Sequence, residues 1–483
     1  MEPTNLLFIM SDEHNKHVLG CYGHPTIRTP NFDALAARGT RFTNAYTNCP
    51  ICVPARASFA TGQHVNQIRY WDNAIAYDGK VPTWGHRLMA QGHHVTSIGK
   101  LHYVDSDPRR NGFDEEVLPL HIVNGVGDLL GLIRDELPRR KGATKLGPEA
   151  GPGQSEYTHY DRSIADEAVK WLGKASEHRD KPWALYVGFV SPHFPLIAPP
   201  EFYAMYPENE VPWPAMDNAG ERPQHPFIDA MRKCLCFDEP FDEPMVRRAI
   251  AAYMGLVSFL DDNVGKIVRA LDQNGLAEST RVVYATDHGD NLGTRGLWGK
   301  STMYEESAAI PLLIAGPDVP MRNVCATPVS LVDGFPTFIH ALGTTPDSRD
   351  AHLPGHSLLD IAQGFVPKRT ILSEYHAAGA LTGSYMIRHG KYKYIHYVGL
   401  PAMLFDLESD PQERNDLGSN PAFARVKAEC EARLRTIVDP EAADKQARSD
   451  QRQYIEKHGG KEAILKRGTF RYSPPPGTKA AYY

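Results

Sequence analysis

Short, almost uninterrupted apolar runs recur along this chain and alternate with segments of helical periodicity. The runs cover residues 5–10, 94–98, 183–190, 281–286 and 310–315. Runs of this length without polar alternation are typical of parallel strands that are buried on both faces. Helical patterns lie at 29–39, 162–172 and 245–274. The alternation predicts an α/β fold in which helices sandwich a large, mostly parallel central sheet.

The pattern changes near residue 375, which predicts a division of the chain into two parts. Residues 1–375 are expected to form the main α/β domain, and residues 376–483 a C-terminal subdomain. Within the second part, 384–387 and 391–397 alternate like hairpin strands and 422–437 has a helical pattern. These segments predict a small antiparallel sheet with a helix. The last segment, 468–483, contains three consecutive prolines and is expected to be extended, reaching a neighbouring subunit of a homo-oligomer.

Charge and composition exclude several classes of partner. The chain has 52 Lys and Arg against 58 Asp and Glu, a net charge of −6. Because there is no long basic run, neither nucleic acid nor a membrane is expected as a partner. No stretch reaches the roughly 18 consecutive apolar residues of a membrane span, and the N-terminus lacks the pattern of a signal peptide. The seven cysteines suggest a reduced compartment, so a cytoplasmic location is expected.

The most informative stretch begins at Cys52 and reads CVPARASFATGQ. Pro54 suits a first helical turn, which would place Cys52 at a helix N-terminus and Arg56 about one turn further on. A helix N-terminus with an arginine can bind an anion, and it would favour an anionic or metal-bound form of residue 52. The short pattern fits a buried structural cysteine before a helix equally well.

Carboxylates follow two of the predicted strands. Asp12 and Glu13 come after the run 5–10, and Asp287 and His288 come after 281–286. In an α/β sheet, ligands gather at the carboxyl ends of the strands. Carboxylates and an imidazole from two strand ends would make an oxygen-rich site for Ca²⁺ or Mn²⁺ rather than a thiolate zinc site. A solvated aspartate at each strand end is the simpler alternative.

The stretch Cys52-x-Pro54-x-Arg56, followed by Ala57 and Thr61-Gly62, resembles the signature of the type I sulfatases of the alkaline phosphatase superfamily. The resemblance implies an alkaline phosphatase-like fold, and it implies that a maturation enzyme oxidises Cys52 to formylglycine. It also implies one divalent metal ion, with Ca²⁺ favoured and Mn²⁺ as the alternative. The implied ligands are Asp12, Glu13, Cys52 as formylglycine, Asp287 and His288.

Two departures from the family pattern concern these ligands. Many sulfatases have Asp-Asp where this chain has Asp12-Glu13, so Glu13 is a less secure ligand than Asp12. Many have Asp-Asn where this chain has Asp287-His288, a form shared with choline-sulfatase-like members and phosphonate monoester hydrolases. The imidazole leaves the choice between Ca²⁺ and Mn²⁺ open.

Further segments match the family in its order: GKLH at 99–102, PHFP at 192–195, GLWGK at 296–300 with YEE at 304–306, and LFDL at 404–407. The resemblance implies that Lys100 and His102 contact the sulfate ester and the modified residue. It implies that His193 binds substrate and that Lys300 supplies a second lysine. With Arg56, these cations would surround one anion. Asn73 is either a contact to the substrate oxygens or a turn-forming residue.

The resemblance implies hydrolysis of sulfate monoesters to an alcohol or phenol and inorganic sulfate. His193 or Lys300 would supply the proton to the leaving group, and His102 is the favoured general base. Hydrolysis of phosphonate monoesters or phosphodiesters is the first alternative, and a catalytically silent anion-binding protein is the second. Loops at 104–160 and 195–245 are expected at the mouth, where an aryl, choline-like or sugar sulfate would fit. Trp213, Phe237 and Phe241 would either stack on the substrate or pack within these loops.

Overall fold

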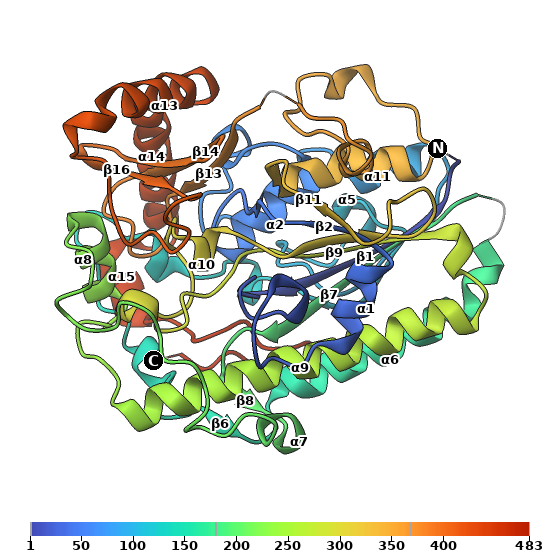
Figure 1. Ribbon diagram of the computed structural model, residues 1–483, viewed down its shortest axis with the longest axis horizontal. Coiled ribbons are helices and arrows are strands. Elements are labelled where there is room, and N and C mark those ends of the chain that lie inside the picture. The colour runs from blue at the N-terminus through green and yellow to red at the C-terminus, as the bar shows by residue number, and fades with distance from the viewer. Residues whose placement is uncertain (1, 179–180, 368, 483) are drawn as a thin grey trace.

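A sheet of eight strands forms the centre of the computed structural model, which describes residues 2–178, 181–367 and 369–482 (Figure 1). The strand order is β11-β2-β10-β9-β1-β7-β4-β5. In chain order the strands are β1 (Asn5–Asp12), β2 (Gly39–Phe42), β4 (Val95–Lys100), β5 (Glu115–Leu120), β7 (Ala184–Pro192), β9 (Thr280–Thr286), β10 (Leu312–Ala315) and β11 (Asn323–Cys325).

Most neighbouring strands run parallel, as the sequence predicts. Strand β1 pairs in parallel with β7 on one side and β9 on the other, and β4 pairs in parallel with β7 and β5. Strand β10 is the exception, because it runs antiparallel to both β9 and β2. An apolar run indicates burial but not direction, so this reversal was not predicted. The carboxyl ends of β1, β4, β7 and β9 therefore meet at one edge of the sheet.

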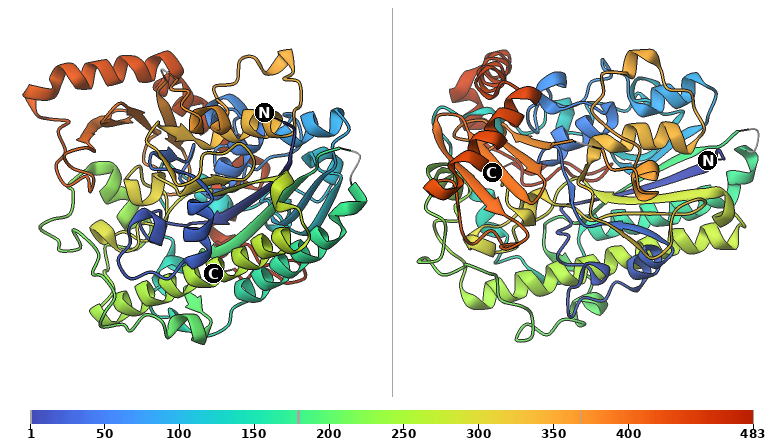
Figure 2. Two further views of the ribbon diagram at one scale, coloured as in Figure 1. Left: turned by 45° about the vertical axis from the view of Figure 1, so that its right-hand side comes forward. Right: turned by 45° about the horizontal axis from the view of Figure 1, so that its top comes forward.

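The central strand β1 is buried on both faces, which explains its nearly continuous apolar sequence. Leu7 and Ile9 point into one core with residues of helices α1, α6 and α9. Phe8 points to the opposite side, where Phe59 of α2 stacks on it with ring centroids 4.7 Å apart. Helices thus cover both faces of the sheet (Figures 1 and 2). The main ones are α1 (Pro30–Ala37), α2 (Cys52–Thr61), α4 (Trp84–Ala90), α6 (Glu156–Lys174), α9 (Glu243–Gln273) and α11 (Gly334–Ala341).

A separate antiparallel sheet lies in the C-terminal part. Its order is β13-β14-β15-β16, and helix α13 packs on it through Cys430 and Leu434. Two helices that the sequence did not indicate, α14 and α15, follow α13 (Figure 1). The bounds are β13 (Ile371–Tyr375), β14 (Ser384–His389), β15 (Tyr392–Tyr397), β16 (Leu400–Asp406), α13 (Ala424–Ile437), α14 (Pro440–Lys457) and α15 (Gly460–Arg467). The division at 375/376 stays a prediction.

The remaining elements are short. Two-stranded sheets pair β3 with β12 and β6 with β8. Their bounds, with those of the short helices, are β3 (Ala45–Tyr46), β6 (Gly151–Pro152), β8 (Ile197–Ala198), β12 (Val329–Ser330), α3 (Val65–Ile68), α5 (Pro108–Asn111), α7 (Pro200–Tyr203), α8 (Pro226–Cys234), α10 (Glu305–Ala308) and α12 (Leu358–Ala362). Among the described residues, none of the helices combines the length and apolar character that a membrane crossing requires.

A buried group of ion pairs joins the C-terminal sheet to two segments of the main α/β part, the start of helix α10 and the loop after β1. Lys393 of β15 lies 3.1 Å from Glu305 and 2.8 Å from Glu413, measured from Nζ to a carboxylate oxygen. Lys16 lies 2.9 Å from the other oxygen of Glu305. Burial alone would raise the pKa of Glu305, but the charges of Lys16 and Lys393 hold that pKa below its usual value. These contacts tie β15 to the start of helix α10.

We expect Lys393→Ala to lower the free energy of unfolding by about 3–5 kcal/mol, because it leaves two buried carboxylates without their shared partner. Lys391→Ala is the control, since the partly exposed Lys391 has one carboxylate partner, Asp406 at 2.6 Å, and lies next to the same strand. Urea unfolding of both variants measures the difference. Equal, small changes in the two variants would contradict a stabilising role for the buried network.

Candidate active site

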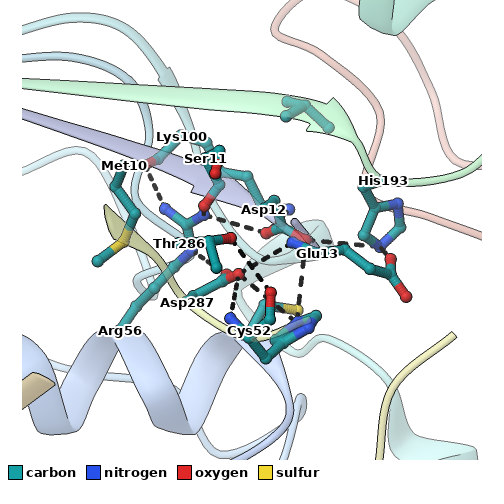
Figure 3. Close-up of polar contacts among 12 residues, drawn as sticks. Met10, Ser11, Asp12, Glu13, Cys52, Arg56, Lys100, His193, Thr286 and Asp287 are labelled. Carbon is teal, nitrogen blue, oxygen red and sulfur yellow. Dashed lines mark hydrogen bonds and ion pairs between the residues drawn. The ribbon is translucent and has the colours of Figure 1, made fainter. Parts of the chain in front are cut away.

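Four strand ends and one helix N-terminus bring the predicted site residues together. Asp12 and Lys100 are the last residues of β1 and β4, and Asp287 directly follows β9. His193 directly follows β7, and Cys52 is the first residue of α2. Figure 3 shows Arg56 extending from α2 toward Asp12 and Asp287, with Cys52 beside them. The parallel arrangement of the strands places these side chains at one edge of the sheet.

Helix α2 begins at Cys52 without a capping side chain from Ile51, the residue before it. Asn73 takes that role, because its Oδ1 accepts a hydrogen bond of 3.2 Å from the Val53 N–H. The Asn73 amide also donates to Cys52 Sγ at 3.5 Å. Burial raises the pKa of the Cys52 thiol, and the charge of Lys300 only partly offsets that effect. For the free thiol, burial therefore outweighs the helix N-terminus and the nearby cations, and the anionic or metal-bound form of residue 52 stays a prediction.

The Arg56 guanidinium is fully engaged by protein groups. Its Nε donates to Asp287 Oδ2 at 2.8 Å, and its Nη2 donates to Asp12 Oδ2 at 3.0 Å. Its Nη1 donates to the Lys100 carbonyl at 3.0 Å and the Tyr186 hydroxyl at 2.8 Å. Arg56 therefore holds two carboxylates and a strand end in place, and its donors are already used within the protein.

The two carboxylates bound to Arg56 have opposite pKa shifts. Burial would raise the pKa of Asp12, but the charges of Lys100, His193 and Arg56 lower it below its usual value. Burial and the charge of Asp12 raise the pKa of Asp287 to about 7. The two groups resist ionising together, because each is buried and close to the other. A divalent cation between them would remove that conflict.

Three buried side-chain atoms at this edge that could bind a metal ion have no hydrogen-bond partner among the described residues. They are Asp12 Oδ1, Glu13 Oε1 and His288 Nε2. His288 Nδ1 lies 3.0 Å from the Gly289 carbonyl, so a proton there would leave Nε2 as a free acceptor. Ligand atoms of Asp12, Cys52 and His288 lie within 4.8 Å of one another. Oxygen and imidazole donors of this kind fit a divalent cation.

Glu13 belongs to a second group with His193 and Lys300. Its Oε2 accepts a hydrogen bond of 3.1 Å from Lys300 Nζ and lies 3.4 Å from His193 Nε2. Ligand atoms of Asp12, Glu13 and His193 also lie within 4.8 Å of one another. Burial raises the pKa of Glu13, although the charge of Lys300 opposes the effect. Glu13 thus connects the candidate cation position to Lys300 and to the His193 ring.

The other cationic candidates surround the same position. Lys100 Nζ is fully buried, 2.6 Å from Asp12 Oδ2. Both ring nitrogens of His102 lack hydrogen-bond partners among the described residues, and burial and Lys100 lower the pKa of this histidine. Burial and Lys300 lower the pKa of His193, whose Nδ1 lies 2.6 Å from the Phe194 carbonyl. Both histidines are therefore neutral near pH 7.

A pocket opens from this site to the surface. At its inner end lie Glu13, Cys52, Asn73, His102, His193 and Lys300. Its apolar wall comes from the loops expected at the mouth and from neighbouring segments, namely Ile51, Val53, Ile122, Leu146, Phe194, Leu235, Phe237 and Trp298. The last part of the wall is Thr469–Ser473, from the C-terminal tail.

The three aromatic residues proposed at the mouth have different positions. Phe237 lines the pocket. Phe241 packs beside Trp298, with ring centroids 5.7 Å apart, and so belongs to the loop packing. Trp213 is 44% exposed and its ring contacts the Arg247 guanidinium. Stacking of substrate on Trp213 or Phe241 is not supported by these positions.

Some residues of the site carry no sequence signal. Asp161 of α6 accepts backbone hydrogen bonds from Val190 and Ser191, both of 2.8 Å, and so fixes the end of β7 just before His193. Tyr157, also on α6, contacts the His193 ring at a centroid distance of 5.9 Å. Both precede the predicted helical segment 162–172, because α6 begins earlier than its pattern indicates, at Glu156. Only their contacts with β7 and its loop reveal them.

Comparison with known proteins adds independent information. The sequence profile of the family described as Sulfatase matches residues 4–344, and the profile described as N-sulphoglucosamine sulphohydrolase, C-terminal, matches residues 293–439. The choline-sulfatase of Rhizobium meliloti (strain 1021) is 33% identical over 441 residues, covering 86% of this chain and 83% of that protein. Arylsulfatase K of Bos taurus is 27% identical over 464 residues, covering 91% and 82%. The phosphonate monoester hydrolase of Agrobacterium radiobacter has the same fold, with a TM-score of 0.71, 23% identity and coverage of 90% and 95%.

We expect Ca²⁺ or Mn²⁺ to raise the melting temperature of chelator-treated protein, because a cation offsets the repulsion between Asp12 and Asp287. At a metal concentration about 100-fold above Kd, the stabilisation is about 2.7 kcal/mol. His288→Ala should remove most of this increase, whereas His159→Ala, at an exposed position of α6, should keep it. Differential scanning calorimetry with and without each metal measures the shift. An equal shift in both variants would exclude His288 as a ligand.

Proposed function

The chain belongs to the sulfatase family and is a sulfuric ester hydrolase, and on that premise we propose that residue 52 acts in its formylglycine form beside a divalent cation. The observation that carries the proposal is the position of Cys52 at the start of α2, within 4.8 Å of the ligand atoms of Asp12 and His288. We favour Ca²⁺, with Mn²⁺ as the alternative, held by Asp12, Glu13, Asp287, His288 and the modified residue. A formylglycine-generating maturation enzyme would be required.

The raised pKa of the Cys52 thiol supports the need for modification. A protonated thiol is a weak nucleophile. The polar contacts of the Cys52 sulfur among the described residues are with the Asn73 amide, which is not a base. In the modified form, one hydroxyl of the hydrated aldehyde would attack sulfur as the bond from sulfur to the leaving oxygen breaks. The second hydroxyl would then lose its proton, so that the bond from carbon to the sulfate oxygen breaks and the aldehyde returns. A cation held by Asp12 and His288 would lower the pKa of the attacking hydroxyl. Asn73 holds the backbone of this turn, and it lies on the pocket wall where substrate oxygens would be bound.

The remaining roles follow from charge and protonation. His102 is neutral and has two unpartnered ring nitrogens, so it suits the general base that removes the proton from the second hydroxyl. The pKa of Lys300 is raised, with Glu13 as the main stabilising charge against the effect of burial, so Lys300 is protonated at neutral pH. We assign proton donation to the leaving oxygen to Lys300 rather than to His193, whose pKa is lowered.

Lys100 and Arg56 are buried beneath the residues that line the pocket. Lys100 Nζ, against Asp12 Oδ2, faces the carboxylate that would bind the cation. Arg56 orients Asp12 and Asp287 together, so its loss would disturb the ligands rather than remove a direct contact to sulfate. Both cations also add positive potential where the transferring sulfuryl group gains negative charge.

Hydrolysis of phosphonate monoesters or phosphodiesters is the second candidate activity. The Asp287-His288 pair favours it, because the imidazole replaces the amide that many sulfatases have. The pair of Lys100 and His102 favours sulfate esters. Values of kcat/KM for 4-nitrophenyl sulfate and 4-nitrophenyl phenylphosphonate, measured on one preparation, rank the two activities.

We also propose a cytoplasmic location and a homo-oligomer, whose contact surface would lie outside residues 469–473, because these residues pack on their own chain. The structure records every described cysteine as a free thiol, which suits a reducing compartment. Light scattering of the full chain gives the oligomeric state. A monomer at micromolar concentration would contradict the proposed assembly.

Cys52→Ser should abolish turnover of 4-nitrophenyl sulfate, because serine provides one hydroxyl and cannot release the bound sulfate by returning to an aldehyde. Cys49→Ser is the matched control, since Cys49 is buried three residues earlier and does not line the pocket. Protein produced with a maturation enzyme should show an aldehyde or its hydrate at residue 52 by mass spectrometry. A free thiol at residue 52 in fully active protein would overturn the proposed mechanism.

Lys300→Ala and His193→Ala separate the two candidate proton donors. We expect Lys300→Ala to lower kcat/KM by about 10²–10⁴-fold for alkyl sulfates, since general acid catalysis matters most for poor leaving groups. The loss should shrink for nitrophenyl sulfates, whose leaving oxygen needs little protonation. His193→Ala should lower kcat/KM by a similar factor for every ester. The opposite pattern would transfer the acid role to His193.

A further inference from the structure

The C-terminal tail returns to the catalytic pocket of its own chain. After α15 ends at Arg467, residues 469–473 form part of the same pocket wall as Cys52 and His193. Thr469 and Ser473 are buried, with 7% and 8% of their surface exposed. Phe470 and Tyr472, the two aromatic residues between them, are half-buried and line the pocket. Figure 1 shows this last, dark red segment running back from α15 toward the sheet.

Specific contacts hold the tail in this position. The Tyr157 hydroxyl donates a hydrogen bond of 2.7 Å to the Ser473 carbonyl, and the Thr469 hydroxyl donates one of 3.1 Å to Asp128. Arg471 forms an ion pair with Glu149. The contacts of Thr469, Arg471 and Ser473 therefore fix the positions of Phe470 and Tyr472 beside the pocket.

Ring contacts connect the tail to the reacting end of the site. Tyr472 packs on Tyr157 with ring centroids 4.8 Å apart, and Tyr157 contacts the ring of His193 at 5.9 Å. The tail is thus two ring contacts from a residue next to the scissile bond of the proposed substrate. An alcohol part bound outside His193 would extend along this aromatic surface.

Away from the reacting end, the pocket wall is electrically balanced. Its charged members among the described residues are Asp128, Arg140 and Arg471. Arg140 pairs with Asp128 at 2.6 Å, and Arg471 pairs with Glu149. Both arginines on this part of the described wall are therefore matched by a carboxylate. The apolar and aromatic side chains around it favour an uncharged, flat alcohol part.

We propose that Phe470 and Tyr472 determine substrate specificity by forming the wall against which the alcohol part of the ester packs, which selects uncharged aromatic alcohols. The inference rests on the proposed function, because it assumes that the sulfate group binds beside residue 52. It adds a binding surface contributed by the end of the chain. Tyr472 adjoins His193 through the Tyr157 ring, and Phe470 lines the same pocket two residues earlier in the tail.

Calorimetric binding to the full chain with Cys52→Ala, which prevents turnover, tests this inference. The probes are 4-nitrophenyl sulfate, 4-nitrophenol and inorganic sulfate. Tyr472→Ala should raise the Kd of the first two by about tenfold, as expected for loss of one stacked, buried ring. The Kd of inorganic sulfate should not change. Tyr472→Phe, which keeps the ring, and Lys479→Ala, at an exposed position of the tail, should both bind like the parent protein.

Turnover by protein that keeps Cys52 and has been matured to formylglycine gives a second readout. Tyr472→Ala should lower the ratio of kcat/KM for 4-nitrophenyl sulfate to that for ethyl sulfate by about tenfold, because leaving-group reactivity cancels when the ratio is compared with wild type. Unchanged affinity for both aryl probes, or an equal loss for inorganic sulfate, would overturn the inference. Absence of sulfate binding and of turnover in every protein would instead contradict the proposed function, while the 4-nitrophenol measurement would still report on the tail.

Discussion

The buried contact of Arg56 with Asp12 and Asp287 is the interaction on which the site depends. Two carboxylates at the ends of adjacent strands would repel each other in a space closed to water. The guanidinium bonds both, at 3.0 and 2.8 Å, and also reaches the Lys100 carbonyl at the end of β4. Because Arg56 stands one turn beyond Cys52 on α2, the same contacts fix the helix N-terminus against the sheet edge. The position of residue 52 is therefore a consequence of how the carboxylates are neutralised.

Much of the fold could be predicted because burial leaves a direct trace in sequence. Strand β1 is apolar at consecutive positions since Leu7 and Phe8 enter different cores, and this signal needs no knowledge of partners. Direction leaves no such trace, which is why the antiparallel placement of β10 could not be foreseen. Helix α14 was missed because its residues are mostly polar and only a few, such as Ala447 and Ile455, are buried. Its contacts are to segments far away in sequence, and local periodicity carries little of that information.

For the site too, sequence patterns identified the residues but not the contacts between them. The predicted strand ends and the motif resemblance identified the residues that the fold gathers at one edge, from Asp12 to His288. The sequence did not indicate which side chains form hydrogen bonds with one another. Arg56 was expected among cations around an anion, whereas its hydrogen bonds go to protein acceptors. Cys52 was expected to be anionic or metal-bound at its helix N-terminus, and for the free thiol burial has the larger effect on its pKa. Tyr157 and Tyr472 could not be connected at all, because their contact joins α6 to a tail with no periodic pattern.

Charge balance explains how a chain with a net charge of −6 can act on an anionic ester. When ionised, the carboxylates of Asp12, Glu13 and Asp287 are matched by Arg56, Lys100 and Lys300, while the nearby histidines are neutral. By itself the inner site therefore has little net charge with which to attract a sulfate group. A divalent cation held by these carboxylates would make the site positive and would also favour their ionised forms. Binding of the cation and of the ester must then support each other, and by linkage each raises the affinity of the other by the same factor. The many acidic groups around Cys52 are consistent with anion binding for this reason.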